Sequence, residues 1–191
     1  MAERVKLVPI EEALKIADAA GLQSRFGRGG AFRTLAHNPD LVKAVYGQLL
    51  TLLFKNRFDT RLRELMIMRI GWVTGSVYEW TQHWRVATEA GIPAEDIVAV
   101  RDWRNSDRMT AADRAILTAT DESLDGKTIS DETWAEVTKY VTDPAEQVEF
   151  VVALGNWTLF SILLRNLRIP LEDGITPWPP DGAVPPAARE G

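Results

Sequence analysis

Residues 60–74 limit the possible folds of this chain more than any other stretch. The segment reads TRLRELMIMRIGWVT, and apolar side chains occupy so many positions that a helix would keep almost no polar face. Such a helix is buried on most sides, because apolar surface is driven out of water. We therefore expect a buried helix that begins at Asp59 or Thr60 and runs to about Thr74.

Glu64 lies inside this apolar segment. A carboxylate buried alone is costly, so Glu64 must be ion-paired, hydrogen-bonded or protonated. One interpretation is an ion pair with Arg61 or with another arginine. The other is a catalytic carboxylate whose pKa is raised by burial. Glu64 by itself does not decide between them.

A second motif follows directly, because Gly75 ends the first helix and Ser76 begins the next. Ser76 and Glu79 match the capping box S-x-x-E, which gives Glu79 a structural role. Glu79 and His83 are four residues apart and share one face of a helix. A carboxylate one turn from an imidazole is a proton-handling pair, half of a metal site, or a cap above a buried histidine.

The remaining chain predicts an all-α fold of roughly eight helices, because no segment alternates convincingly as a strand would. Residues 25–30, rich in glycine, are expected to form a flexible loop. Six of the ten prolines follow residue 169, so we expect one all-α domain over residues 1–169 and an extended Pro-rich tail over residues 170–191. Cap signals and apolar periodicity predict further helices at residues 11–20, 39–54, 76–90, 93–103, 116–124, 130–141 and 143–167.

Composition narrows the possible functions. The chain has no cysteine, which excludes disulfides, thiolate metal sites and thiol catalysis. Its net charge of −5 and its scattered arginines argue against nucleic acid as a partner. No signal-peptide pattern opens the sequence, and the apolar run 150–164 is interrupted and short for a membrane span. A cytoplasmic location without membrane contact is expected.

Three segments carry a resemblance to a known family. They are RLRELMIMRI at residues 61–70, GSVYEWTQH at residues 75–83 and AGIPAEDI at residues 90–97. Together they are similar to the carboxymuconolactone decarboxylase and alkyl hydroperoxidase D-like superfamily, with a core match over about residues 35–100. The resemblance implies an all-α fold and a homo-oligomer, often a trimer or hexamer, with sites near subunit contacts.

The resemblance also implies a site. In the peroxidase branch of the family, a C-x-x-C pair opens the helix that carries the histidine, and a glutamate of the preceding helix joins the proton relay. The cysteine positions are Ser76 and Glu79 here, whereas the glutamate and histidine positions are retained as Glu64 and His83. Serine and carboxylate side chains cannot cycle through sulfenate and disulfide, so thiol peroxidase activity should be absent.

The residues that remain in the motif, Glu64, Glu79 and His83, can donate and accept protons. We expect Glu64 and His83 to transfer protons, with the charged form of His83 favoured by nearby carboxylates. The positive helix end should stabilise the anion of Glu79, which we expect to orient, to cap, or to take part as a third catalytic residue. Substrate contacts are expected from Tyr78, Trp80, Arg61 and Ser76.

Three functions follow, in order of preference. The first is a cofactor-independent acid–base enzyme, a decarboxylase, isomerase or lyase acting on a small carboxylated or lactone-like molecule. The second is a non-catalytic module that binds a small molecule or a partner. The third, a metal site of Glu79, His83 and Glu64 from a second subunit, ranks low: the other imidazole, His37, is distant in sequence and expected to bond local backbone.

Overall fold

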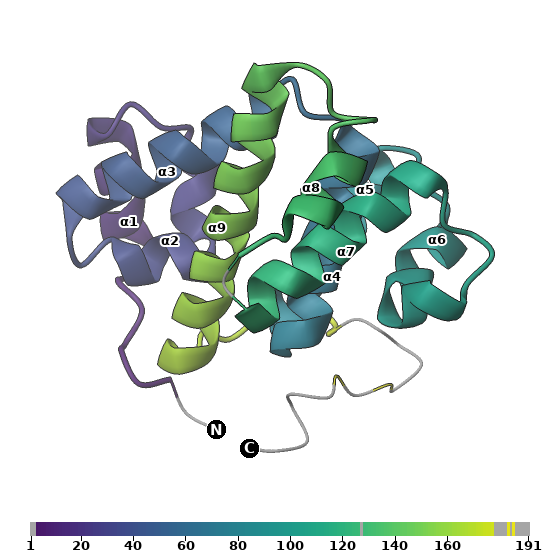
Figure 1. Ribbon diagram of the computed structural model, residues 1–191. Coiled ribbons are helices and arrows are strands. Elements are labelled where there is room, and N and C mark those ends of the chain that lie inside the picture. The colour runs from purple at the N-terminus through teal and green to yellow at the C-terminus, as the bar shows by residue number, and fades with distance from the viewer. Residues whose placement is uncertain (1–2, 127, 178–182, 184, 186–191) are drawn as a thin grey trace. The chain divides into compact units, whose positions relative to one another are not determined.

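The computed structural model describes residues 3–126, 128–177, 183 and 185. Within these residues the chain is all-α, as predicted, with nine α-helices, two short 3-10 helices and no strand. Their bounds are α1 (Ile10–Ala19), η1 (Ser24–Arg28), α2 (Gly30–Leu35), α3 (Pro39–Phe54), α4 (Thr60–Thr74), α5 (Val77–Glu89), α6 (Ala94–Ala99), η2 (Val100–Asn105), α7 (Ala111–Gly126), α8 (Asp131–Val137) and α9 (Pro144–Leu167) (Figure 1).

The chain divides into two compact units. Unit 1 comprises Met1–Lys55 with Leu163–Thr176, and unit 2 comprises Asn56–Ile162 with Pro177–Gly191. Helix α9 contributes its first part to unit 2 and its last residues to unit 1. The assignment of residues 1–169 to one domain stays a prediction, and each unit is described by itself.

Unit 1 corrects one expectation from the sequence. Residues 25–30 were expected to be a flexible loop, but they belong to η1 and to the start of α2. Gly27 explains why this segment is packed against α1, because a Cβ added at Gly27 would lie 3.0 Å from the backbone of Ala13 in α1. Glycine here permits close packing of η1 on α1.

Unit 2 is built around α4, which is buried along most of its length as the apolar segment predicted. Two bidentate ion pairs join α4 to α7, Arg61 with Asp113 and Arg69 with Asp121. Both partners advance by eight residues from one pair to the next, so α4 and α7 run in the same direction. We call these two pairs the arginine ladder.

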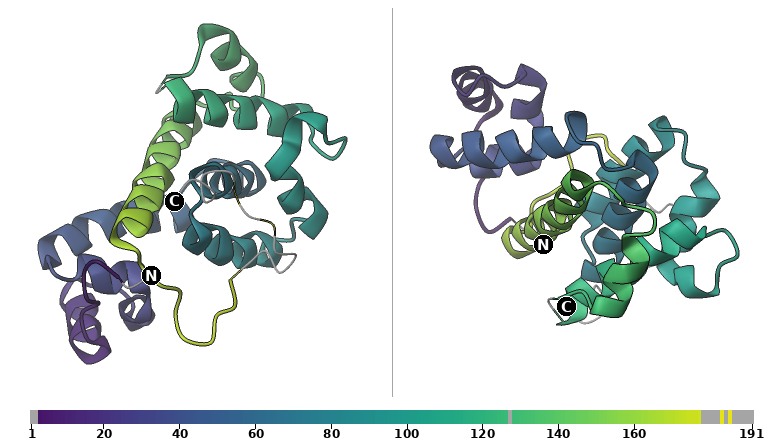
Figure 2. Two further views of the ribbon diagram at one scale, coloured as in Figure 1. Left: turned by 90° about the horizontal axis from the view of Figure 1, so that it is seen from below. Right: turned by 45° about the horizontal axis from the view of Figure 1, so that its top comes forward.

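The turn between α4 and α5 positions the candidate site. Gly75 ends α4 in the left-handed region, with φ at 70°, where glycine meets no Cβ strain. The chain then reverses, and α4 and α5 lie side by side in both views of Figure 2. They approach closely at Gly71, where an added Cβ would lie 3.3 Å from the backbone nitrogen of Trp80.

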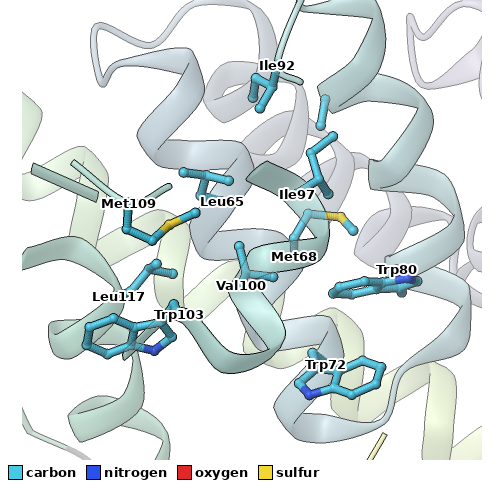
Figure 3. Close-up of a cluster of buried hydrophobic side chains, with 11 residues drawn as sticks. Leu65, Met68, Trp72, Trp80, Ile92, Ile97, Val100, Trp103, Met109 and Leu117 are labelled. Carbon is cyan, nitrogen blue, oxygen red and sulfur yellow. The ribbon is translucent and has the colours of Figure 1, made fainter. Parts of the chain in front are cut away.

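A cluster of buried apolar side chains fills the space on one side of α4 (Figure 3). Trp72 of α4 and Trp80 of α5 meet at 5.3 Å between ring centroids. The guanidinium of Arg101 lies over both rings, at 4.7 Å and 5.4 Å from their centroids. Burial of this aromatic pair anchors α5 against α4.

Helix α9 is longer than the apolar run seen in the sequence. Among the described residues it is the one helix whose length and hydropathy would allow it to cross a membrane. Its inward face, including Phe150, Trp157 and Phe160, is buried in the protein, as in a core helix. A cytoplasmic location without membrane contact stays a prediction.

The predicted tail is described only in part. Residues 170–177, 183 and 185 are not helical, as the prolines predicted. The other residues of the predicted tail lie outside the described residues.

Candidate functional site

The candidate site lies within unit 2, where α4, α5 and α9 bring four polar side chains together. Glu64, in the second turn of α4, has no exposed surface, and its Oε1 accepts hydrogen bonds from Arg63 at 2.9 Å and 2.8 Å. Its Oε2 lies 2.7 Å from Nδ1 of His83. Glu64 thus joins a guanidinium to an imidazole in the interior.

His83 has a partner on each ring nitrogen. Nδ1 faces Glu64, and Nε2 accepts a hydrogen bond from Nε1 of Trp157 in α9 at 2.8 Å. The two rings meet edge to face at 83°, with centroids 5.5 Å apart. Three helices therefore fix the orientation of one buried imidazole.

Glu79 approaches the same imidazole from one turn earlier in α5. Its Oε2 lies 3.6 Å from Nε2 of His83, and the residue is 6% exposed. This distance is too long for a direct hydrogen bond but keeps the two groups in strong electrostatic contact.

The predicted capping box of Ser76 and Glu79 is not formed, so that expectation was wrong. Gly75 is left-handed, and the Ser76 N–H donates to the carbonyl of Gly71 at 2.9 Å. The Ser76 N–H is then not available to donate to the Glu79 carboxyl, as a capping box requires. Ser76 Oγ is buried and makes no hydrogen bond within the described residues. Glu79 is therefore released from the capping role that the motif predicted.

A capping box does form at the start of α7, and its hydrogen bonds show what the first one lacks. Thr110 Oγ1 accepts from the Asp113 N–H at 3.1 Å, and Asp113 Oδ2 accepts from the Thr110 N–H at 2.9 Å. The Thr110 N–H is thus available to its cap, whereas that of Ser76 is already bonded to the end of α4.

The two carboxyl groups titrate in opposite directions. Burial raises the pKa of Glu64, but the charges and hydrogen bonds of His83 and Arg63 lower it by more, so the net direction is down. Burial raises the pKa of Glu79 to about 7, since the opposing charge of His83 is only partly effective and the negative Glu64 adds to the rise. Of the two interpretations of Glu64, the ion pair with an arginine is confirmed, with Arg63 as the partner, and the raised pKa is not found. The expectation of a stabilised anion for Glu79 was wrong.

The pKa of His83 moves as expected. Burial lowers it, but the Glu64 carboxylate raises it through charge and hydrogen bond, and Glu79 adds in the same direction against a smaller effect of Arg63. The net direction is up, in agreement with the expected preference for the charged form.

The predicted substrate contacts lie in different surroundings. The Arg61 guanidinium is bound by Asp113 and Asp96, so Arg61 does not pair with Glu64. Trp80 is 1% exposed and packs in the core beside Trp72 (Figure 3). Tyr78 is half-buried. Their substrate roles stay predictions.

Ser76 lies at the start of α5, the helix that carries Glu79 and His83. Ser76, Glu79 and His83 are spaced by three and seven residues from the first, so they follow one face at the start of α5. A buried hydroxyl without a partner is costly, and such groups are common at binding sites.

Other candidate features lie elsewhere. His37 bonds to backbone as expected, but the expected local partner was wrong, because the partner is the carbonyl of Lys6, 31 residues away. No group of three or more histidine, aspartate or glutamate residues suited to a metal ion occurs in the part of the chain that the structure describes. A pocket of about 490 Å³ is lined by unit 1 residues, including Leu22, Phe26 and Phe54, and by none of the predicted site residues.

Two residues make contacts in the site that the sequence did not specify, Arg63 with Glu64 and Trp157 with His83. Arg63 belongs to a scattered group of arginines, and adjacent residues on a helix, such as Arg63 and Glu64, do not normally face each other. The bond from Trp157 to His83 spans 74 residues, so no local pattern could reveal it. The indole N–H was the available signal, because a buried tryptophan usually finds a partner.

The comparisons with known proteins cover the segment that carries the site residues. Residues 39–122 match the carboxymuconolactone decarboxylase family, a stretch that contains Glu64, Ser76, Glu79 and His83. This match confirms the resemblance seen in the sequence. No curated protein matches the chain.

Solved structures share the fold at low sequence identity. A cysteine-to-alanine variant of the debrominase Bmp8 in complex with 2,3,4-tribromopyrrole is 18% identical, with a TM-score of 0.70 over 91% of this chain and 94% of that one. An alkylhydroperoxidase AhpD core protein from Ralstonia eutropha JMP134 is 15% identical, with a TM-score of 0.69 over 92% and 97%. A putative antioxidant defence protein AhpD from Agrobacterium tumefaciens is 21% identical, with a TM-score of 0.65 over 71% and 94%.

Proposed function

We propose that this chain, which carries a carboxymuconolactone decarboxylase family segment, is a cofactor-independent acid–base enzyme acting on a small carboxylated or lactone-like molecule. The reaction class is decarboxylation, isomerisation or elimination, each of which needs a proton given or taken beside a carbonyl. The observation that carries the proposal is Glu79, a buried carboxyl with a pKa of about 7 beside His83. A group with this pKa both donates and accepts protons near neutral pH.

The roles within the site follow from the contacts. Glu79 transfers the proton, because its pKa is poised while that of Glu64 is lowered. Glu64, neutralised by Arg63, orients His83 through Nδ1. This arrangement revises the predicted pair of Glu64 and His83, since Glu64 is stabilised as an anion.

Ser76 is proposed to bind a substrate oxygen. Its hydroxyl is available as a donor, and it stands at the amino end of α5, where the helix dipole favours negative charge. A carbonyl or carboxylate oxygen bound there would bring its neighbouring carbon toward Glu79. No step uses a thiol, because the chain has none.

The test is turnover of a panel of small lactone acids, followed by release of carbon dioxide and by exchange of carbon-bound hydrogen for deuterium. Replacing Glu79→Gln should lower kcat by roughly 100- to 10,000-fold, the usual contribution of a positioned acid or base. Glu89→Gln, at an exposed position of the same helix, is the matched control. Wild-type rates in Glu79→Gln would overturn the role of Glu79.

A non-catalytic binding module is the second candidate. The observation that favours it is that both ring nitrogens of His83 already have partners, as in a satisfied core histidine. Calorimetric binding of lactone acids without hydrogen exchange or turnover, equal in wild type and Glu79→Gln, would support this candidate over the enzyme.

A homo-oligomer is proposed as the assembly. Helix α9 exposes apolar side chains at Val148, Val151, Val152, Leu159 and Ile162, spaced so that they form one stripe. Such a stripe is unusual on a monomer surface. Replacing Val151→Lys should lower the mass measured by light scattering, whereas an unchanged mass would exclude this stripe as the contact.

A further inference from the structure

Trp157 has no role in the proposed function, although it contacts the central imidazole directly. Its Nε1 lies 2.8 Å from Nε2 of His83, and the tryptophan is 1% exposed. The indole nitrogen can only donate a hydrogen bond. Nε2 of His83 must therefore present its lone pair to Trp157.

The other ring nitrogen completes the assignment. Nδ1 lies 2.7 Å from Oε2 of Glu64, which is held as an anion by Arg63. A carboxylate accepts, so Nδ1 carries the proton. The Trp157 hydrogen bond at Nε2 thus opposes the rise in the His83 pKa that the two carboxyl groups cause, and it favours the neutral imidazole with its proton on Nδ1.

A second proton could enter the ring only at Nε2. There it would meet the Trp157 N–H head-on, and that N–H would lose its partner in the buried interior. The charged and titratable groups that face the ring are Glu64 and Arg63 of α4 and Glu79 of α5. Of these, Glu79 is the one placed to take the proton that Nε2 gives up.

We propose that Trp157 is a positioning residue that keeps Nε2 of His83 unprotonated and thereby places the mobile proton of the pair on Glu79. In this transfer the N–H bond at Nε2 breaks, its electron pair stays on nitrogen and accepts from Trp157, and an O–H bond forms on Glu79. The total charge of the pair is unchanged. Glu79 is then a neutral acid and His83 a neutral imidazole.

This inference deepens the proposed function by naming which group holds the proton, but the proton itself can be located without a substrate. The variant is Trp157→Phe, which keeps an aromatic ring and removes the donor. Trp103→Phe is the matched control, because Trp103 is also buried and its Nε1 donates to Asp121, in the arginine ladder.

The measurement is a pH titration by NMR of the Glu79 carboxyl carbon and the His83 ring nitrogens. In Trp157→Phe, the Glu79 pKa should fall and the His83 pKa should rise, each by roughly one pH unit, the value of one buried hydrogen bond. Trp103→Phe should leave both unchanged. Identical titrations in wild type and Trp157→Phe would overturn the inference.

A measurement on the wild type covers the case in which Trp157→Phe does not fold. Scalar coupling across the hydrogen bond, from Trp157 Nε1 to His83 Nε2, is expected at about pH 6, below the raised pKa of Glu79, together with a protonated Nδ1. A proton on Nε2 at that pH would overturn the inference. If instead Glu79→Gln keeps full turnover while these couplings are present, the proposed function fails and the placement of the proton stands.

Discussion

Helix α4 contributes side chains to two clusters of charged and titratable groups, and the clusters differ in their balance of positive and negative charge. The arginine ladder and its neighbours set four guanidinium groups, from Arg61, Arg69, Arg104 and Arg108, against four carboxylates, from Glu95, Asp96, Asp113 and Asp121. The acid–base cluster sets the single guanidinium of Arg63 and the imidazole of His83 against the carboxyl groups of Glu64 and Glu79.

The titration of the two groups follows from this balance. Burial alone would raise the pKa of Asp96, but hydrogen bonds and charges of Arg61 and Arg108 lower it by more. Glu79 is not opposed by a guanidinium among the described residues, so burial raises its pKa to about 7. Matched charges therefore make a structural ion-pair network, whereas an excess carboxyl makes a group that titrates near neutral pH.

The largest effect is expected from removing the guanidinium of the acid–base cluster. Arg63→Met should lower the free energy of unfolding by about 3–5 kcal/mol, because it leaves the Glu64 carboxylate buried without its counter-charge. Denaturant unfolding measures this. Arg85→Met, at a position whose side chain is 68% exposed, is the control and should change little. A small effect of Arg63→Met would mean that His83 alone neutralises Glu64.

The next effect tests whether the ladder is purely structural. Asp121 binds Arg69, Arg104 and Trp103, so Asp121→Asn should lower the free energy of unfolding by about 2–3 kcal/mol. The Glu79 titration should not move, because the two groups share no partner among the described residues. A shift in the Glu79 pKa would show that they are coupled after all.

The pH dependence of stability distinguishes the excess carboxyl. The pKa of Glu79 is about 7 in the folded protein against 4.5 for the free group, so the folded state binds more protons between these values. The contribution of Glu79 to stability is therefore fully present below pH 4.5 and is lost as pH rises toward 7 and beyond. In Glu79→Gln this loss should disappear, which stabilises the variant at about pH 8 by about 2 kcal/mol relative to wild type.

Thermal unfolding at about pH 5 and about pH 8, on either side of the raised pKa, measures this difference. Glu89→Gln is the control. Equal stability changes at both pH values would contradict the raised pKa of Glu79.

The smallest effect is expected at the rim of the ladder. The side chain of Arg108 is 43% exposed and pairs with Asp96 at 2.7 Å. Arg108→Gln should cost about 0–1 kcal/mol and less at high salt, since exposed ion pairs are weak and screened. A loss as large as that of Asp121→Asn would show that the whole network acts as one unit.

Much of the fold could be predicted from the sequence because local signals determine it. Helices α3, α4 and α8 begin within one residue of the predicted positions, and Asn38, Asp59 and Ser130 accept hydrogen bonds from amides of their first turns. Helix α7 begins at Ala111, ahead of the predicted start at residue 116. The glycine-rich residues 25–30 were misjudged, because glycine is typical both of flexible loops and of close packing, and only the position of α1 distinguishes them.

The site was predictable in its members but not in their roles. Glu64, Glu79 and His83 come together as the motif spacing indicated. Their protonation depends on Arg63, on Trp157 and on the direction of the Ser76 N–H, which are set by tertiary packing. A pattern such as S-x-x-E assumes a free amide before the helix, and the left-handed Gly75 removes it.

The close contact between Gly71 and Trp80 is a steric feature, without charged groups, that affects the spacing of the site residues. Glu64 lies seven residues before Gly71, and His83 lies three residues after Trp80. The spacing between the two residues therefore depends on how closely α4 and α5 approach at Gly71 and Trp80. A methyl group at Gly71 would push the helices apart by a few tenths of an ångström. The absence of a side chain at residue 71 therefore permits the close approach of the two helices that carry Glu64 and His83.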